Sequence, residues 1–393
     1  MTWLVTVVLV SGWFAWLGYR TSPLLLHGDW GFFESGARSL VRYHGQSLYR
    51  ASSLHLYANN PELQIGPPAL LLVAAAESLA TRTIEELFTG IIAALGVVSL
   101  LSAGHASRRY AKRTGGRTGW NVRLLGAGVL TIAIWSYQSA EWMHLDDALA
   151  LTLVALAALL IEADQPWWAV AGLLGTAAAA KPWAVIFVAL LIALRRTEIS
   201  KALLVYIAAA AIWWLPFIVA APNTIAALGQ FPVFPSSGSV VYLLGAHGQI
   251  HGWLRPAQFV LGIAAGCAVG RERDWVRVPL AALAVRVVTD PYTFSYYGLG
   301  PLLFAYVYDA ANVPSRRFPL ATAVTAAVEF GLPWLHTPGA LMGVARLAWG
   351  LGILFLVFRK TDALGRIRQH LGRQRGLGVG DSQLVGADAG HSQ

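Results

Sequence analysis

Ionisable side chains are rare in this 393-residue sequence, so the places where they gather are the first candidates for chemistry. The densest group runs from Glu141 to Asp147, where His144 and two adjacent carboxylates, Asp146 and Asp147, precede an apolar run. Imidazole and carboxylate groups suit divalent cations, so a metal site is one interpretation. The other is that Asp146 or Asp147 caps the helix that begins near Ala148, because Asp is favoured at helix N-termini.

Asp29 is an isolated carboxylate that follows the first apolar run of the chain. Charged groups at membrane depth are costly and tend to be functional. Asp29 could equally cap the next helix, and both interpretations stay open. The segment that follows, Phe32 to Leu40, has the pattern of a short amphipathic helix lying along a membrane interface.

Two cations interrupt other apolar stretches. Lys181, followed by Pro182 and Trp183, must either extend outward to water or bind an anion, and an ammonium at the mouth of a cavity suits phosphate. Arg286 lies four residues before Asp290, so the two either pair on a helix or form an anion-binding arginine supported by a carboxylate. The aromatic run containing Tyr296 and Tyr297 is either an interface belt or a wall facing a sugar or lipid.

The composition indicates that these residues are held by membrane-spanning segments. Hydrophobic residues make up 56% of the chain, charged residues 12%, and the mean hydropathy is +0.55. Soluble domains carry roughly twice that charged fraction, which excludes a water-soluble enzyme. The 16 Trp and 13 Tyr are typical of anchors at membrane interfaces. The single cysteine, Cys267, excludes an internal disulfide and a Cys-based zinc site.

Twelve apolar segments predict an all-α integral membrane protein. Several are shorter than the ~20 residues needed to cross a bilayer, and we expect these to extend into their flanks or to lie half-buried in the bundle. The segments are Met1–Tyr19, Thr83–Gly104, Leu124–Tyr137, Ala148–Ile161, Trp168–Ala180, Ala184–Leu194, Ala202–Ala221, Phe259–Val269, Val278–Val288, Gly298–Tyr308, Pro319–Leu335 and Leu341–Phe358.

Two stretches between the spans are long enough to have a role of their own. Residues 20–82 are too long for a simple connector, and we interpret Ile65–Ala80 as an interfacial helix that begins at paired prolines. We expect residues 222–256 to form a mobile lid or substrate loop. That loop carries His247, His251 and Arg255.

The basic residues predict the orientation of the chain. With the N-terminus inside and one crossing per segment, 20 of the 29 Lys and Arg fall in cytoplasmic loops and in the tail. Both termini are then cytoplasmic and the candidate site is extracytoplasmic. Counting Ile65–Ala80 as a span would instead place the Arg108–Arg123 cluster outside. Since topology accounts for the net charge of +9, no nucleic-acid partner is expected. Residues 1–375 form the membrane unit, and 376–393 are predicted to be a disordered tail.

The order of these motifs resembles that of GT-C membrane glycosyltransferases, in particular glycosyltransferase family 87, the polyprenyl-phosphate-mannose-dependent mannosyltransferases. The resemblance covers about the first 200 residues, and the region from Asp290-Pro291 to Tyr296-Tyr297 supports it more weakly. The chain departs from the usual Tyr-Pro-Pro of the family. The motifs are Asp29, Leu48-Tyr49-Arg50, Gly66-Pro67-Pro68, His144-Leu145-Asp146-Asp147, and Gly172 followed by Ala180-Lys181-Pro182.

The resemblance implies a GT-C-like bundle of about twelve transmembrane helices that transfers a sugar, mannose in the family, with inversion. The donor would be a polyprenyl phosphate, and the acceptor a hydroxyl of a lipid, glycan or protein on the extracytoplasmic face. Asp29 matches the general base, and Lys181 and Arg286 would stabilise the departing phosphate. A lipid phosphate is already a good leaving group, so a divalent cation would fit but no cofactor is required. The residues expected to bind sugar or acceptor are His144, Asp146, Asp147, Tyr49, Asp290, Tyr296 and Tyr297.

Two other functions remain open at this point. A multi-pass transporter or flippase of a lipid-linked saccharide would place ionisable residues near the middle of several spans, and only Arg286 and Arg346 fit that pattern. A lipid-phosphate-dependent polymerase or ligase would differ from a simple transferase in the length of its acceptor.

Overall fold

The computed structural model describes residues 2–21, 30–42, 53–60, 63–79, 84–115, 122–229, 232–250, 252–312 and 318–377. Asp29, Tyr49 and the predicted disordered tail beyond 377 lie outside these ranges. Across the described ranges the chain is helical and contains no strand, apart from a single bridge between Arg271 and Asp274. The predicted all-α class is therefore confirmed.

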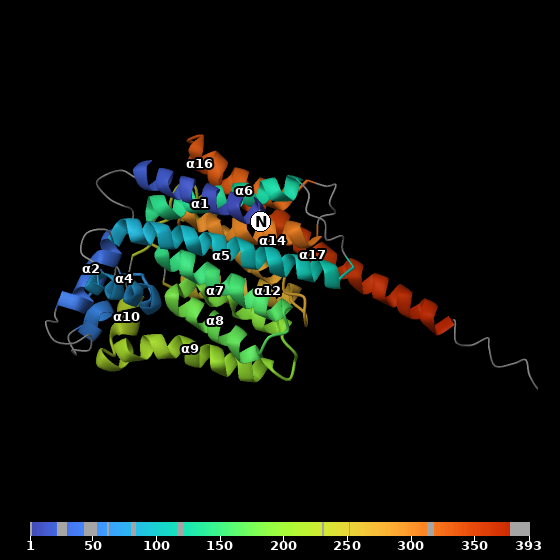
Figure 1. The fold of residues 1–393 in the computed structure, drawn as a ribbon, viewed down its shortest axis with the longest axis horizontal. Helices are drawn as coiled ribbons and strands as arrows, with labels where there is room; N and C mark the ends of the chain where they lie inside the picture. The colour runs from blue at the N-terminus through green and yellow to red at the C-terminus, as the bar shows by residue number, and fades with distance from the viewer. Residues whose placement is uncertain are drawn as a thin grey trace, which may run out of the picture.

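Long helices from the first half of the chain lie side by side and form most of the body (Figure 1). Within this group α1 packs on α6, α5 on α7, and α8 on both α7 and α9. The bounds are α1 Thr2–Thr21, α5 Ile84–Arg113, α6 Val122–Trp142, α7 Leu145–Glu162, α8 Trp167–Ala180 and α9 Ile199–Ala220.

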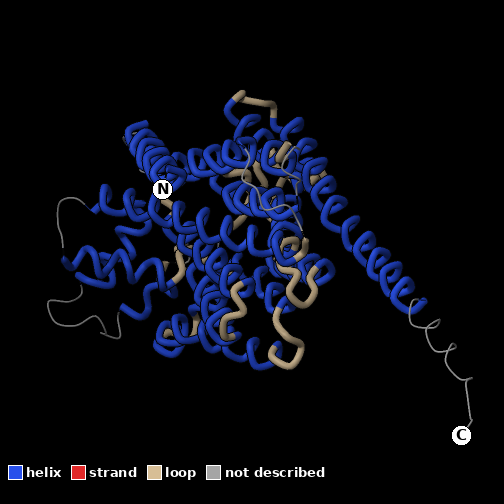
Figure 2. The backbone as a smooth tube through the Cα atoms, turned by 45° about the vertical axis from the view of Figure 1, so that its right-hand side comes forward, coloured by secondary structure: helices blue, strands red, loops and turns tan. Residues whose placement is uncertain are grey.

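The second half of the chain packs against this group through shorter helices and ends in a long one. The 3₁₀ helix η2 is buried between α8, α12 and α13. The final helix α17 extends beyond the rest of the body at one end (Figures 1 and 2). The bounds are η2 Pro182–Ala193, α10 Thr224–Leu228, α11 Val240–Leu243, α12 Leu254–Val269, α13 Val278–Thr289, η3 Ser295–Gly298, α14 Leu299–Asn312, α15 Leu320–Ala326, the π-helical turn η4 Ala327–Gly331, α16 Leu332–Trp334 and α17 Gly339–Leu377.

The described residues between the first two long helices fold into short helices, of which α2 and α4 were predicted and η1 and α3 were not. The buried residues of α2, Trp30, Phe33, Ala37 and Leu40, recur at helical spacing and pack towards α4, so the helix is amphipathic. Its more polar side carries the ion pair between Glu34 and Arg38. The bounds are α2 Trp30–Arg42, η1 Ser53–His55, α3 Leu56–Asn59 and α4 Pro67–Leu79.

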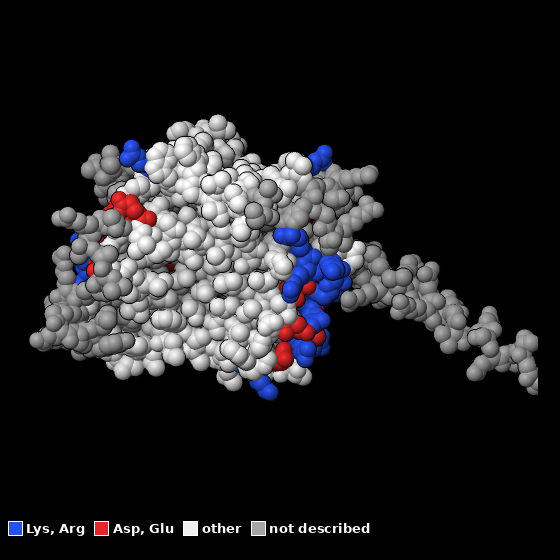
Figure 3. Space-filling view, viewed as in Figure 1, with Lys and Arg blue, Asp and Glu red and all other residues white. Residues whose placement is uncertain are grey.

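The distribution of apolar and charged side chains is that of a membrane protein. Four of the described helices are long and apolar enough to cross a bilayer, namely Trp3–Thr21, Ile84–Arg113, Ile199–Ala220 and Gly339–Arg359. Large apolar side chains such as Ile212 and Val219, each 70% exposed, point outward from α9. Charged side chains gather near the ends of the body, with an uncharged band between them (Figure 3). This band matches the apolar interior of a bilayer.

The predicted apolar segments all coincide with helical structure, but several are shorter than a bilayer requires. Six apolar helices of 10–17 residues accompany the four long ones within the described ranges. A count of twelve crossings stays a prediction for this reason. Residues 222–256 also contain structure that the sequence pattern did not predict, the short helices α10 and α11.

The end of α7 with Glu162 carries a network of ion pairs. Arg113 donates to both carboxylate oxygens of Glu162, at 2.9 and 2.8 Å, and Trp275 donates to the same group. In the nearby loop, Asp164 pairs with Arg273 at 2.6 Å. The hydrogen bond and charge of Arg273 lower the pKa of the Asp164 carboxyl below its ordinary value. These contacts fasten α5, α7 and the 271–277 loop together at one end of the body.

Candidate functional site

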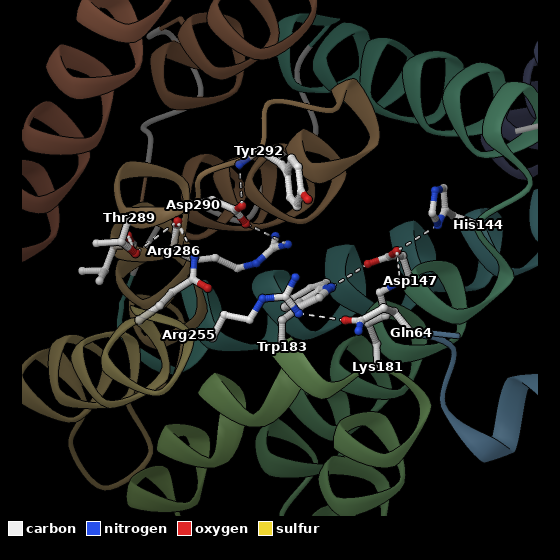
Figure 4. A network of polar contacts seen from close by, with 12 residues as sticks. Gln64, His144, Asp147, Lys181, Trp183, Arg255, Arg286, Thr289, Asp290 and Tyr292 are labelled. Carbon is white, nitrogen blue, oxygen red and sulfur yellow. Dashed lines mark hydrogen bonds and ion pairs between the residues drawn. The ribbon is translucent and has the colours of Figure 1, made fainter. Parts of the chain in front are cut away.

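A cavity of about 270 Å³, lined by aromatic and charged side chains, lies at the opposite end of α7, where the helix begins. The 18 residues of α7 place this cavity about 27 Å from the Glu162 network. Its walls come from segments far apart in the sequence, and Figure 4 shows how their polar side chains converge. The lining residues include Phe32, Phe33, Gln64, Trp142, His144, Asp146, Lys181, Trp183, Arg255, Gln258, Arg286, Asp290, Tyr292, Phe294, Tyr296 and Tyr297.

A tight turn presents the His144–Asp147 cluster to this cavity. The helix α6 ends at Trp142 and α7 begins at Leu145, which leaves two residues for the reversal. Met143 is fully buried and takes the left-handed conformation, with φ of 54°. A non-glycine residue rarely adopts that conformation, and such outliers gather at functional sites. This turn could not be predicted from the sequence, because methionine has no preference for turns.

Lys181 joins the two carboxylates of the cluster. Its Nζ lies 2.6 Å from Oδ2 of Asp146 and 3.2 Å from Oδ2 of Asp147. The Trp183 indole donates to Oδ1 of Asp147 at 2.6 Å. The side chain of Lys181 is only 12% exposed, so it does not reach outward to water. Neither carboxylate occupies the N-cap of α7, which is His144. Asp146 still accepts the backbone N–H of Asp147 in the first turn, and both Asp side chains also bind residues of another segment.

The same cluster offers the geometry of a metal site. One ligand atom each from His144, Asp146 and Asp147 lies within 4.8 Å of the others. The Nδ1 of His144 is 3.3 Å from Oδ2 of Asp147. Lys181 already supplies the positive charge between the carboxylates, so a divalent cation would have to displace the ammonium. The arrangement therefore fits a buried ion pair better than a metal centre.

Arg286 and Asp290 form the second charged pair of the cavity. Their Nη2 and Oδ2 atoms are 3.4 Å apart, which confirms the pairing interpretation of their spacing. The guanidinium also lies over the rings of Trp183 and Tyr297, 4.1 and 4.6 Å from the two centroids. The backbone amide of Tyr292 donates to Asp290. Burial raises the pKa of the Asp290 carboxyl above its ordinary value, while Arg286 opposes that shift.

An aromatic wall faces these charges. The rings of Phe294 and Tyr296 are stacked with centroids 5.6 Å apart, and Trp142 lies 5.8 Å from Tyr296. The imidazole of His144 also stacks on Tyr296, with the two ring centroids 3.5 Å apart. Flat apolar surfaces beside a few fixed polar groups are typical of small-molecule sites.

The structure brings together most of the residues that the sequence singled out. One cavity is lined by His144, Asp146, Lys181, Arg286, Asp290, Tyr296 and Tyr297, and Asp147 contacts Lys181 at 3.2 Å. Asp29 and Tyr49 fall outside the described residues, although Phe32 and Phe33 of α2 reach the cavity.

Other lining residues were not predicted individually. Tyr292 and Phe294 belong to the aromatic run that was interpreted as an interface belt or a wall facing a sugar or lipid, and both line the cavity. Trp142 and Trp183 each lie two residues from a predicted site residue, and that proximity was the available signal. Gln64, Arg255 and Gln258 are polar residues next to apolar helices on the predicted outer side. Arg255 was assigned to a mobile lid or substrate loop without a role of its own, and its side chain lines the cavity.

No family model, curated protein or solved structure matches this chain. The fold and the cavity define a helical membrane protein with a buried, charged and aromatic site, and its function has to be argued from that site.

Proposed function

We propose that the protein is an inverting glycosyltransferase that moves a sugar, mannose by the family resemblance, from a polyprenyl-phosphate donor to an acceptor hydroxyl. The observation that carries the proposal is the cavity itself. It combines cations, carboxylates and an aromatic wall, and it lies at the end of an apolar bundle. A sugar needs polar groups and flat ring faces, a phosphate needs cations, and a prenyl chain needs an apolar surface beside them.

In this proposal the acceptor is a lipid, glycan or protein, and the residues divide the chemistry. Asp29 accepts the proton of the acceptor hydroxyl as its oxygen attacks the anomeric carbon. The bond from that carbon to the phosphate oxygen breaks, and polyprenyl phosphate leaves with the electron pair. The aromatic wall and the carboxylates hold the sugar. Cations of the cavity stabilise the negative charge that develops on the phosphate.

The proposal places the cavity on the extracytoplasmic face and the Glu162 network in the cytoplasm. Arg108, Arg109, Lys112 and Arg113 belong to the far end of α5 from the cavity, which agrees with the positive-inside rule. Both termini would then be cytoplasmic, with about twelve crossings between them.

The transporter alternative relied partly on Arg346 as an ionisable residue within a span. Arg346 is paired with Glu329 of η4 at 2.9 Å, and both are buried. Glu329 belongs to η4, which packs on η3, and Tyr296 and Tyr297 of η3 line the cavity, so the pair lies at the same end of the bundle as the cavity. This placement favours a site at one face over a pathway through the middle.

The test is sugar transfer by purified protein in lipid nanodiscs, with labelled polyprenyl-phosphate sugars and a panel of acceptors. Wild type should yield labelled acceptor, and Asp29→Asn should abolish the product while inserting and folding normally. Near-normal transfer by that variant would remove Asp29 as the base. Movement of an intact lipid-linked saccharide across vesicles, without transfer, would support the flippase instead.

A further inference from the structure

The cavity holds three cations among its described lining residues, and they differ in what they contact. Lys181 is bound to Asp146 and Asp147, and Arg286 to Asp290. Each of these cations is thus neutralised by a carboxylate. An incoming phosphate would have to compete with a fixed negative charge at either position.

Arg255 is the third cation, and it contacts a neutral group. Its Nη1 donates to the side-chain oxygen of Gln64 at 2.7 Å, and within the described residues this is its one hydrogen bond. No carboxylate of the described chain lies within ion-pair distance of it. Figure 4 shows Arg255 extending towards Gln64, with the Arg286–Asp290 pair on one side and Lys181 and Asp147 on the other. The remaining N–H groups of its guanidinium are therefore available to an anion.

The elements around Arg255 hold it in place through neutral groups, and none of these contacts is an ion pair. It belongs to the first turn of α12, and Gln64 lies just before α4, so the hydrogen bond joins two segments that are 191 residues apart. On the next turn, Gln258 donates to the carbonyl oxygen of Arg286. The start of α12 is thereby fastened to both neighbouring walls of the cavity.

We propose that Arg255, positioned by Gln64, is the residue that binds the phosphate group of the lipid donor. Guanidinium binds phosphate through two parallel N–H donors, which fits a group that must hold a phosphate monoester or diester in one orientation. In this arrangement Lys181 and Arg286 hold the carboxylates with which they are paired. They interact with the phosphate only in the transfer step, as negative charge develops on it. The inference rests on the proposed function, since it names the group that holds the donor of that reaction.

The test is binding of a long-chain polyprenyl phosphate, without sugar, to purified protein in nanodiscs. Arg255→Gln should weaken binding about tenfold or more, because one charge-assisted contact is lost. The affinity of Arg255→Lys for polyprenyl phosphate should lie between those of Arg255→Gln and wild type, because lysine keeps the positive charge and loses the two parallel N–H donors of the guanidinium. Binding of the uncharged polyprenol should be the same in all variants. Arg196→Gln, on an exposed residue between η2 and α9, is the matched control and should bind normally.

Gln64→Glu gives the sharper test. It would place a carboxylate on Arg255 and so put this arginine in the same state as Arg286. We expect it to weaken phosphate binding about as much as Arg255→Gln, although the added ion pair leaves folding intact. A purely structural role for the contact predicts the reverse, since an ion pair would hold the two segments at least as well as the amide does.

The outcomes separate this inference from the function on which it rests. Normal binding of polyprenyl phosphate by Arg255→Gln or by Gln64→Glu overturns the inference, even if the wild type transfers sugar. A wild type that binds the lipid through Arg255 and transfers no sugar contradicts the proposed function alone. Inorganic phosphate, tested in the same assay, distinguishes the source of the anion. If it binds as tightly as the lipid, the assignment to the donor is wrong.

Discussion

Lys181 shows how the cavity tolerates charge inside an apolar bundle. Asp146 and Asp147 are almost completely buried, and the ammonium of Lys181 touches both. Removing one partner of a buried pair leaves an uncompensated charge, which costs far more than the intact pair contributes. The ammonium is therefore needed for the folded state as well as for the chemistry proposed here.

Replacing Lys181 by Gln should lower the free energy of unfolding by about 3–5 kcal/mol, because two carboxylates would remain buried with no cation between them. Thermal unfolding in detergent micelles would measure the loss. Lys201→Gln, on an exposed residue of α9, is the control and should unfold like wild type. Adding Asp146→Asn to Lys181→Gln should restore part of the stability. Equal unfolding of the Lys181 and Lys201 variants would contradict the interpretation.

The identity of the site residues could be predicted from the sequence, but their pairing could not. Charged groups are so scarce that His144, Asp146, Lys181 and Arg286 stood out by type alone. The contact between Lys181 and Asp146 joins residues 35 apart, and nothing local specifies it. The one pairing that was anticipated, Arg286 with Asp290, follows from helical spacing.

Among the helices, the junction of α4 with α8 depends on a glycine. The backbone N–H of Gly66 donates to the carbonyl oxygen of Ala180 at 3.0 Å, directly before Lys181. A Cβ at position 66 would overlap the carbonyl oxygens of Ala179 and Ala180. This close approach explains why the sequence has Gly before its paired prolines and could not accommodate a tyrosine there.

Gly66→Ala should therefore push the start of α4 away from the end of α8. We expect a loss of about 1–3 kcal/mol in the free energy of unfolding, as for other overpacked sites, and reduced sugar transfer because Lys181 is displaced. Gly126→Ala, in α6, is the control, since a Cβ there meets open space and alanine favours the helix. Comparing the unfolding and the transfer activity of the two variants checks the prediction. Wild-type behaviour of Gly66→Ala would rule out the tight junction.

Helical segments were easier to predict than their ends or their winding. Apolar runs located every long helix, because burial in a bilayer demands continuous apolar sequence. The 3₁₀ winding of η2 and the π-helical turn η4 depend on packing against neighbours, and hydropathy does not report it. The reach of α5 to Arg113, beyond the predicted Gly104, was missed because its last turns are charged.

For the molecule as a whole, the cavity and the ion-pair network lie at opposite ends of the body, and the surface between them in Figure 3 carries almost no charge. Because the two ends are distinct, the predicted orientation can be tested by cysteine labelling. Only one native cysteine, Cys267, has to be removed first. With Cys267 replaced by Ala, a cysteine can be placed at either end of the body. Thr114 follows α5 beside the network, Gln249 precedes α12 on the cavity side, and both are exposed.

An impermeant maleimide applied to intact cells should label Gln249→Cys, and it should label Thr114→Cys only after permeabilisation. The physical reason is the excess of Arg and Lys at the Thr114 end, which holds that end in the cytoplasm. Mass spectrometry of the purified variants would quantify the label. The reverse pattern would place the cavity in the cytoplasm and overturn the proposed topology.

The winding of η2 also fixes a distance. Its 12 residues span about 24 Å as a 3₁₀ helix and would span about 18 Å as an α-helix. One end is held where Trp183 binds Asp147, and the other where the carbonyl of Ala193 accepts the amide of Arg273. A change of winding would shorten the segment by more than any hydrogen bond can stretch, so one of these attachments would have to release. The 3₁₀ helix η2 thus sets the distance between the cavity and the 271–277 loop, and its length and the geometry of the cavity cannot change independently.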